Sequence, residues 1–288
     1  MRALSDERFA GLDRREAPLA DREEVLRCHP ARYFVRVKGS IPTSGTFALD
    51  GDTHVVPGSL EAALRGVGGC TAAIDAVIAG EVANAFVAMR PPGHHAETET
   101  AMGFCLFGNA AIAAKRALDH NGLNRVAVLD FDVHHGNGTQ DLLWNEARTL
   151  FASSHQMPLY PGSGSVHETG AHDNVLNVPL APMTGGAEMK RAWGDLILPA
   201  VDDFAPELVI ISAGFDAHAA DPLANLNWST EDFRWLTAQL CALAAEMCEG
   251  RIVSTSGRNV RERSWDATRE GTFAGFAMAV LVNRYSAS

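Results

Sequence analysis

The chain is poor in cysteine and in basic residues, and it has no long hydrophobic segment. Its five cysteines (Cys28, Cys70, Cys105, Cys241 and Cys248) are scattered and form no Cys-x-x-Cys pair, which argues against a disulfide scaffold or a structural zinc knot. Lysine and arginine number 24 against 35 aspartates and glutamates, and the formal net charge of −11 argues against broad contact with nucleic-acid backbones or anionic lipid. No apolar run reaches membrane-spanning length, and the first residues lack a signal-peptide core. We therefore expect a cytoplasmic protein without a nucleic-acid or membrane partner.

What the sequence does have is apolar residues in a regular pattern. Hydrophobic residues make up 47% of the 288 residues, which is enough for a substantial buried core. Short runs rich in β-branched or aromatic residues alternate with helical stretches, a pattern typical of a mostly parallel sheet with helices on both faces. We predict a single α/β domain over residues 1–288, with strands at 85–89, 125–130, 150–153, 174–178, 208–212 and 251–255 and helices at 59–78, 106–120, 185–204 and 229–248.

Polar side chains cluster just after two of these strands. Asp130, Asp132 and His134 share the parity of the strand 125–130, so they project together as the strand opens into its loop. Asp216 follows the strand 208–212, and the carboxyl ends of parallel strands form the ligand-binding edge of such a sheet. Two carboxylates and one histidine would leave positions of a zinc ion open for water and substrate. A bare Asp-x-His is more often a turn cluster, but the doubled acids and paired histidines favour a metal site.

A second cluster reads Arg90-Pro-Pro-Gly-His94-His95-Ala-Glu97 and follows the strand 85–89. Adjacent histidines can belong to an ordinary polar loop, yet the prolines and the glycine make this segment rigid. Two imidazoles beside a metal-bound water can divide the acid and base work if their partners differ, because a carboxylate partner favours imidazolium and an amide partner does not.

Four segments together resemble the histone deacetylase superfamily, which includes acetylpolyamine and acetoin-utilisation proteins on the arginase-like α/β fold. They are the His94-His95 segment, Gly103-Phe-Cys-Leu-Phe-Gly-Asn, Asp130-Phe-Asp-Val-His-His-Gly-Asn-Gly-Thr-Gln and Ser212-Ala-Gly-Phe-Asp-Ala-His. The last two look like the class II branch. The resemblance runs from about residue 21 to residue 255.

The resemblance implies a role for each matching residue. Asp132, His134 and Asp216 match the ligands of one zinc ion per chain. His95, paired with Asn137, matches the general base, and His94, paired with Asp130, matches an electrostatic or proton-donating partner. The remaining matches are a substrate channel (Gly103, Phe104, Tyr160 and Leu223) and a structural monovalent cation site, normally potassium (Asp130, Asp132, His134, Ser153 and Ser154).

The implied activity is hydrolysis of the acyl amide of acetyl-lysine, or of a small acylated amine, by a metal-activated water. An alternative is a non-catalytic, zinc-containing module that binds acyl-lysine without turnover. An arginase-like enzyme with two manganese ions is a third reading, disfavoured because the segment at Asp216 lacks a second acid of the Asp-x-Asp type.

The sequence departs from the family pattern at three places. The first strand and an acidic rim loop are expected to be missing, which would expose a sheet edge, and Gly108 replaces an asparagine. After Thr255 the family's Glu-Gly-Gly-Tyr, whose tyrosine donates to the oxyanion, is absent. Tyr285 is the only later tyrosine, and we interpret residues 256–288 as a divergent or frame-altered tail. Impaired catalysis is the expected consequence.

Overall fold

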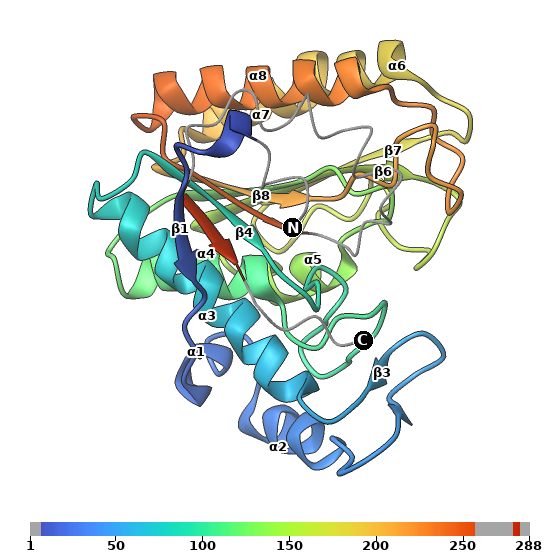
Figure 1. Ribbon diagram of the computed structural model, residues 1–288. Helices are drawn as coiled ribbons and strands as arrows, with labels where there is room; N and C mark the ends of the chain where they lie inside the picture. The colour runs from blue at the N-terminus through green and yellow to red at the C-terminus, as the bar shows by residue number, and fades with distance from the viewer. Residues whose placement is uncertain (1–6, 257–278, 283–288) are drawn as a thin grey trace.

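A parallel β-sheet forms the centre of the computed structural model, which describes residues 7–256 and 279–282 (Figure 1). Every strand pair within this eight-stranded sheet is parallel, so the predicted α/β class is confirmed. In spatial order the strands are β1 (Asp13–Glu16), β10 (Ala279–Val282), β4 (Asn84–Ala88), β9 (Ile252–Ser256), β8 (Leu208–Ala213), β5 (Val126–Asp130), β6 (Thr149–Gln156) and β7 (Val175–Leu180).

The six predicted strands are present within two residues at their ends, except that β6 continues to Gln156. From the sequence, a missing first strand is expected to leave an unpaired edge on the sheet. For β4 this expectation is wrong. Its free side pairs with β10, and β10 in turn pairs with β1. The edge strand β1 reads Asp-Arg-Arg-Glu and lacks an apolar pattern, so no residue pattern predicts a strand there. Charged residues on an edge strand also discourage pairing with other chains.

Two helical layers cover the sheet because strand side chains alternate between its faces (Figure 1). Ala127 and Leu129 of β5 belong to the core beneath α6 to α8, whereas Val126 and Val128 belong to the core formed with α3 and α4. The helices on the first face are α6 (Gly186–Arg191), the π-helical η3 (Ala192–Ile197), α7 (Leu198–Phe204) and α8 (Thr230–Met247). The other face carries α3 (Ser59–Ile78), α4 (Asn109–Asp119) and α5 (Asn137–Leu143).

Local signals explain where several helices begin and break. Ser229 caps α8, because its side chain accepts from the backbone of Asp232 and the Asp232 carboxylate accepts from the Ser229 backbone. The predicted helix 185–204 is divided into α6, η3 and α7. Pro199 lies in the first turn of α7 and cannot donate the hydrogen bond that a continuous α-helix needs there.

A smaller lobe precedes α3 and was not predicted in detail. It contains α1 (Arg22–Val25), α2 (Ala31–Gly39) and the hairpin of β2 (Phe47–Ala48) and β3 (His54–Val55). The short η2 (Glu7–Phe9) lies apart from this lobe, because Phe9 packs in the core beneath α6 to α8. Tyr33, Phe34 and Phe107 form a ring cluster in a separate core between this lobe and the start of α4.

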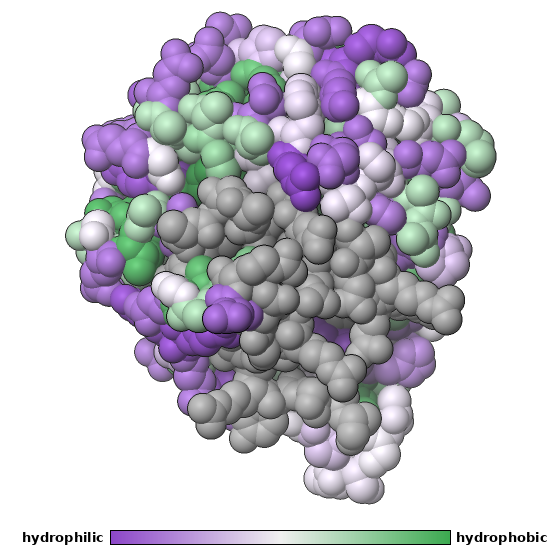
Figure 2. Space-filling model, turned by 45° about the horizontal axis from the view of Figure 1, so that its top comes forward, coloured by the Kyte–Doolittle hydropathy of each residue, from purple (hydrophilic) through white to green (hydrophobic). Residues whose placement is uncertain are grey.

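Hydrophilic residues predominate on the described surface in Figure 2, and apolar residues occur there in small groups. This pattern agrees with the acidic composition and the net charge of −11. Among the helices of residues 7–256, none is both long and apolar enough to cross a lipid bilayer.

Candidate metal centre and active site

Asp132, His134 and Asp216 converge because β5 and β8 are neighbouring parallel strands, with Asp130 opposite Ser212. Asp132 and His134 lie in the loop after β5, and Asp216 lies in the loop after β8. One ligand atom from each residue lies within 4.8 Å of the others, and all three residues are buried. The structure thus brings together the three residues predicted to bind metal; their role as ligands stays a prediction.

The chemistry of these three side chains fits a divalent cation. Nδ1 of His134 lies 3.0 Å from Asp132 Oδ1 and 3.1 Å from Asp216 Oδ2. Burial lowers the pKa of His134, but the two carboxylates more than offset this and raise it to about 9. The buried site therefore favours positive charge strongly. Two carboxylate oxygens and one imidazole nitrogen are also a donor set that catalytic zinc sites use.

The backbone around the site holds the carboxylates in place. Val133 N donates to Asp216 Oδ1 at 3.0 Å, and His134 N donates to Asp132 Oδ1 at 2.9 Å. Gly214 packs directly on Asp132, since a Cβ added at Gly214 would lie 2.1 Å from Asp132 Oδ2. Only glycine allows the loops after β5 and β8 to approach this closely.

Replacing Gly214 with alanine is therefore expected to displace the Asp132 carboxylate and to weaken zinc binding by about 10–100-fold, the usual effect of disturbing groups that orient metal ligands. Competition with a chromophoric chelator measures this affinity. Gly194→Ala is the matched control, because no atom lies within 4 Å of a Cβ built there. Equal zinc affinity of the two variants would contradict the assignment of Asp132 as a ligand.

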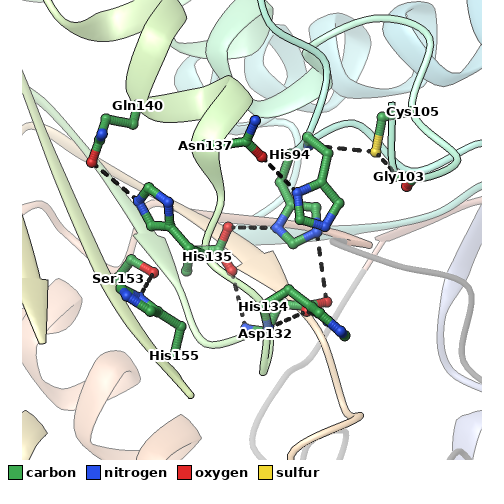
Figure 3. A network of polar contacts seen from close by, with 12 residues as sticks. His94, Gly103, Cys105, Asp132, His134, His135, Asn137, Gln140, Ser153 and His155 are labelled. Atoms are coloured by element: carbon green, nitrogen blue, oxygen red, sulfur yellow. Dashed lines mark hydrogen bonds and ion pairs between the residues drawn. The ribbon is translucent and has the colours of Figure 1, made fainter. Parts of the chain in front are cut away.

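The tandem histidines follow β4 and lie beside this group. Figure 3 shows His94 next to Asp132 and His134. His94 Nδ1 donates to Asp130 Oδ2 at 3.1 Å, and His95 Nδ1 lies 2.7 Å from Asn137 Oδ1. The two ring centroids are 3.9 Å apart. Both pairs that the family resemblance implies are thus in contact, one with a carboxylate and one with an amide.

The two imidazoles have opposite charge preferences. Burial lowers the pKa of His94, but Asp132 and Asp130 more than compensate, so that its pKa lies above the ordinary value. Burial and the neighbouring His94 hold the pKa of His95 well below its ordinary value. Since an amide oxygen only accepts, His95 carries its hydrogen on Nδ1 and leaves a lone pair on Nε2. His94 Nε2 has no hydrogen-bond partner among residues 7–256 and 279–282, and lies 3.9 Å from Asp132 Oδ2.

Two of the four predicted channel residues, Gly103 and Tyr160, lie against the His95 ring. Gly103, with a φ of +55°, packs on the His95 ring, where an added Cβ would lie 2.3 Å from Cδ2. Phe104 follows it and is 39% exposed, and Tyr160 is 38% exposed with its ring centroid 5.2 Å from that of His95. Leu223 is 40% exposed on the loop after β8. That loop is tied to β6 by the Asn225 N–H, which donates to Gln156 Oε1 at 2.8 Å.

The expectation that the acidic rim loop is missing is wrong. Phe104 N donates to Thr53 Oγ1 at 3.1 Å, and Thr53 N donates to Asp50 Oδ1 at 2.5 Å. Burial, followed by the negative charges of Asp50 and Asp52, raises the pKa of Tyr160 to about 12. Two aspartates therefore lie at the rim of the channel. The sequence Asp-Gly-Asp at residues 50–52 was the available signal, but only the fold brings it next to Phe104.

Three of the five residues of the predicted monovalent cation site lie on the neighbouring strands β5 and β6, namely Asp130, Ser153 and Ser154. Asp130 and Ser153 are directly opposite each other in β5 and β6. His155 Nε2 donates to Gly164 O at 3.0 Å, so its Nδ1 accepts from the Ser153 hydroxyl at 2.9 Å and leaves the lone pairs of that oxygen available. Ser154 points to the other face, where its hydroxyl accepts from Trp193 Nε1 at 3.0 Å. Ser154 could join the site only through its backbone carbonyl. Potassium stays a prediction.

His135 and His155 form a second pair of neighbouring histidines near the site. Their ring centroids are 4.7 Å apart, and all four ring nitrogens have hydrogen-bond partners. Burial lowers the pKa of His135 to about 3 and that of His155 to about 4. This pair is therefore neutral, and Ser163 and Gly164 connect it to the loop that carries Tyr160.

A parallel α/β sheet with this Asp-His-Asp group at the carboxyl ends of its strands defines the arginase/deacetylase-like class of folds. The family model of the histone deacetylase domain matches residues 1–257. The chain belongs to this family. The match begins at residue 1, whereas the motif resemblance began only near residue 21.

Similar proteins include a histone deacetylase-like amidohydrolase of Pseudomonas aeruginosa, 42% identical over 85% of this chain and 65% of the relative. A probable deacetylase of Archaeoglobus fulgidus is 38% identical over 82% of this chain and 66% of the relative. The solved structure of the HDA15 HD domain superposes with a TM-score of 0.84 at 31% identity, covering 90% of this chain and 76% of that one. The chain spans about two thirds of the length of the first two relatives.

Proposed function

We propose that the chain is a zinc-dependent amidohydrolase that removes the acyl group from acetyl-lysine or a related small acylated amine. The observation that carries this proposal is the buried group of Asp132, His134 and Asp216 next to two histidines with different partners. The deacetylase and amidohydrolase names of similar proteins support the reaction class. Aspartates at the channel rim would favour substrates that carry positive charge.

Asp132, His134 and Asp216 would hold the zinc ion, which when bound supplies a Lewis acid for the amide carbonyl and lowers the pKa of a water molecule. His95 accepts a proton from the attacking water at Nε2, because its Nδ1 is engaged by Asn137. His94, whose pKa is raised by Asp132 and Asp130, stabilises negative charge and can donate a proton to the departing amine. The proton that His95 took from the water makes up for this loss, so the overall reaction is balanced. Water thus adds to the acyl carbon, the C–N bond breaks, and the products are a carboxylate and an amine. Phe104 and Tyr160 orient the aliphatic part of the substrate.

The oxyanion donor is the weak part of this site. Related enzymes use the tyrosine of a Glu-Gly-Gly-Tyr segment, and the sequence after Thr255 reads Ser-Gly-Arg-Asn instead. Tyr285 lies outside the described residues. We therefore propose slow turnover, because one preorganised oxyanion donor is worth about 10²–10³-fold in rate.

Replacing Asp216 with alanine is expected to abolish stoichiometric zinc binding while most secondary structure remains. Asp216 supplies one of the two carboxylates of the group, so its loss leaves one carboxylate and one imidazole. Metal analysis of the purified protein and far-UV circular dichroism measure the two parts of this prediction. Asp221→Ala, in the same loop and equally buried but outside the group, is the control. Full zinc occupancy in Asp216→Ala would refute the ligand assignment.

Hydrolysis of an acetyl-lysine peptide, measured with and without a hydroxamate, tests the function itself. Slow hydrolysis that the hydroxamate abolishes supports the proposal. Zinc and hydroxamate binding without any hydrolysis would instead favour a non-catalytic acyl-lysine-binding module. The observation behind this alternative is the missing Gly-Gly-Tyr segment, because without its tyrosine the site lacks the family's oxyanion donor. Two manganese ions per chain would favour an arginase-like enzyme, although the residues 7–256 contain a single candidate group of metal ligands.

A further inference from the structure

We propose that Glu97 is a positioning residue that fixes the orientation of the Asn137 amide and, through it, the tautomer of His95. The catalytic consequence rests on the proposed function, whereas the tautomer itself is a property of the folded chain. Glu97 has no role among those that the family resemblance implies for this site. It lies two residues after His95, in the same loop.

The amide of Asn137 has two distinct sides, and each faces a different kind of partner. Its Nδ2 donates to Glu97 Oε1 at 2.7 Å and approaches Met102 Sδ at 3.4 Å. A carboxylate and a thioether only accept, so the nitrogen must be on this side. The oxygen Oδ1 therefore faces His95 Nδ1, 2.7 Å away. Asn137 is only 6% exposed, so water has little access to replace these partners.

This orientation decides which nitrogen of His95 is free. With Oδ1 against Nδ1, the hydrogen must be on Nδ1, and Nε2 keeps the lone pair that a general base needs. A flipped amide would donate from Nδ2 to Nδ1 and force the hydrogen onto Nε2. It would also place Oδ1 against the Glu97 carboxylate, where two acceptors repel each other. Glu97 thus makes the unproductive tautomer of His95 unfavourable. It acts only through Asn137, because it forms no hydrogen bond with His95 itself.

The loop that carries Glu97 is fixed to the helix that carries Asn137. Thr98 donates from its backbone N–H at 2.7 Å and from its hydroxyl at 2.6 Å to Asp141 Oδ2, and Asp141 belongs to α5. Asn137 is the first residue of the same helix. The backbone N–H of Glu97 donates a hydrogen bond to the carbonyl oxygen of Thr100 at 3.0 Å. Glu97 and Asn137 are therefore parts of one rigid unit, as a positioning contact requires.

Glu97→Lys tests this role directly, because an ammonium group only donates and would turn Asn137 Oδ1 away from His95. Nitrogen-15 NMR of labelled histidine distinguishes protonated from unprotonated ring nitrogens. We expect the hydrogen of His95 on Nδ1 in the parent and on Nε2 in Glu97→Lys, with and without zinc. Turnover is expected to fall about 10²-fold with little change in KM, since general-base catalysis contributes about 10²–10⁴-fold. Glu97→Gln, whose Oε1 still accepts from Asn137, should retain the parent tautomer.

The double variant Glu97→Lys/Asn137→Asp tests whether the loss in Glu97→Lys comes from the flipped amide or from the introduced lysine charge. An aspartate at position 137 accepts from both the lysine and His95 Nδ1. The hydrogen of His95 should therefore return to Nδ1, and turnover should rise at least tenfold above that of Glu97→Lys. Glu99→Lys, an equal charge change at an exposed ion pair with Arg32, is the matched control and should keep the parent tautomer.

A Glu97→Lys protein that keeps the hydrogen on Nδ1 would overturn the proposal, and so would a double variant no faster than the single one. A parent without any hydrolysis would contradict the proposed function alone, because the NMR comparison needs no turnover.

Discussion

His95→Ala is expected to lower turnover by about 10²–10⁴-fold, the usual contribution of a general base, while zinc and hydroxamate binding persist. The side chain contacts Asn137 and the neighbouring rings rather than the carboxylates of the metal group, so its removal leaves the candidate ligands in place. Its pKa is held well below the ordinary value by burial and by His94, so the ring is neutral and able to accept a proton at neutral pH. Steady-state kinetics on an acetyl-lysine peptide, together with zinc analysis, measure both parts.

His29→Ala is a matched control for the loss of a buried imidazole. His29 is 1% exposed, and its ring nitrogens are bonded to the backbone of Thr98 and Gly108 rather than to the site. It should lose stability more than turnover per folded molecule. If His95→Ala keeps a rate within tenfold of the parent, His95 is not the base, and the roles of the two histidines must be exchanged.

The elements that the sequence predicts well are those with a strong local pattern. Helix α3 has the predicted bounds, and the capping sequence at Ser229 marks the start of α8 correctly. Strand β1 was missed because four charged residues carry no apolar alternation. Helix α5 was missed because it begins at Asn137, inside a Gly-Asn-Gly segment that has the composition of a loop.

For the candidate site too, local sequence patterns predict some of the contacts and only the fold shows the others. Strand parity and the rule that parallel strands share a ligand-binding edge were enough to group Asp132, His134 and Asp216. The partners of His94 and His95 came only from the family resemblance, because spacing does not determine which side chains meet. The close contact of Gly214 with Asp132 depends on how two loops pack, and no local pattern encodes it. For the same reason the rim aspartates and the orientation of Asn137 became visible only in the fold.

Giving the segment after Thr255 the sequence Glu-Gly-Gly-Tyr is expected to raise turnover by about 10²–10³-fold, the usual worth of one oxyanion donor. Three substitutions are sufficient: Ser256→Glu, Arg258→Gly and Asn259→Tyr. They are preferable to exchange of the whole tail, because a tail exchange would also remove β10, which pairs with both β4 and β1.

The position of β9 in the sheet is the structural reason for this expectation. β9 lies between β4 and β8, and these strands lead into the tandem histidines and into Asp216, respectively. The carboxyl end of β9 therefore points to the same edge of the sheet, between the candidate base and a candidate zinc ligand. A hydroxyl donor supplied just after this strand would be suitably placed to stabilise the oxyanion of the proposed reaction.

The same three substitutions with Asn259→Phe in place of Asn259→Tyr are the matched control, since they differ from the repaired chain by one hydroxyl group. The gain should be absent in this control, and it should be smaller for trifluoroacetyl-lysine than for acetyl-lysine, because an activated acyl group depends less on the donor. Rates must be compared per zinc-loaded, folded molecule. If the parent already turns over as fast as the tyrosine variant, another group stabilises the oxyanion. If the phenylalanine variant shows the same increase in turnover, the increase comes from the changes that the two variants share, and the tyrosine hydroxyl does not contribute to the rate.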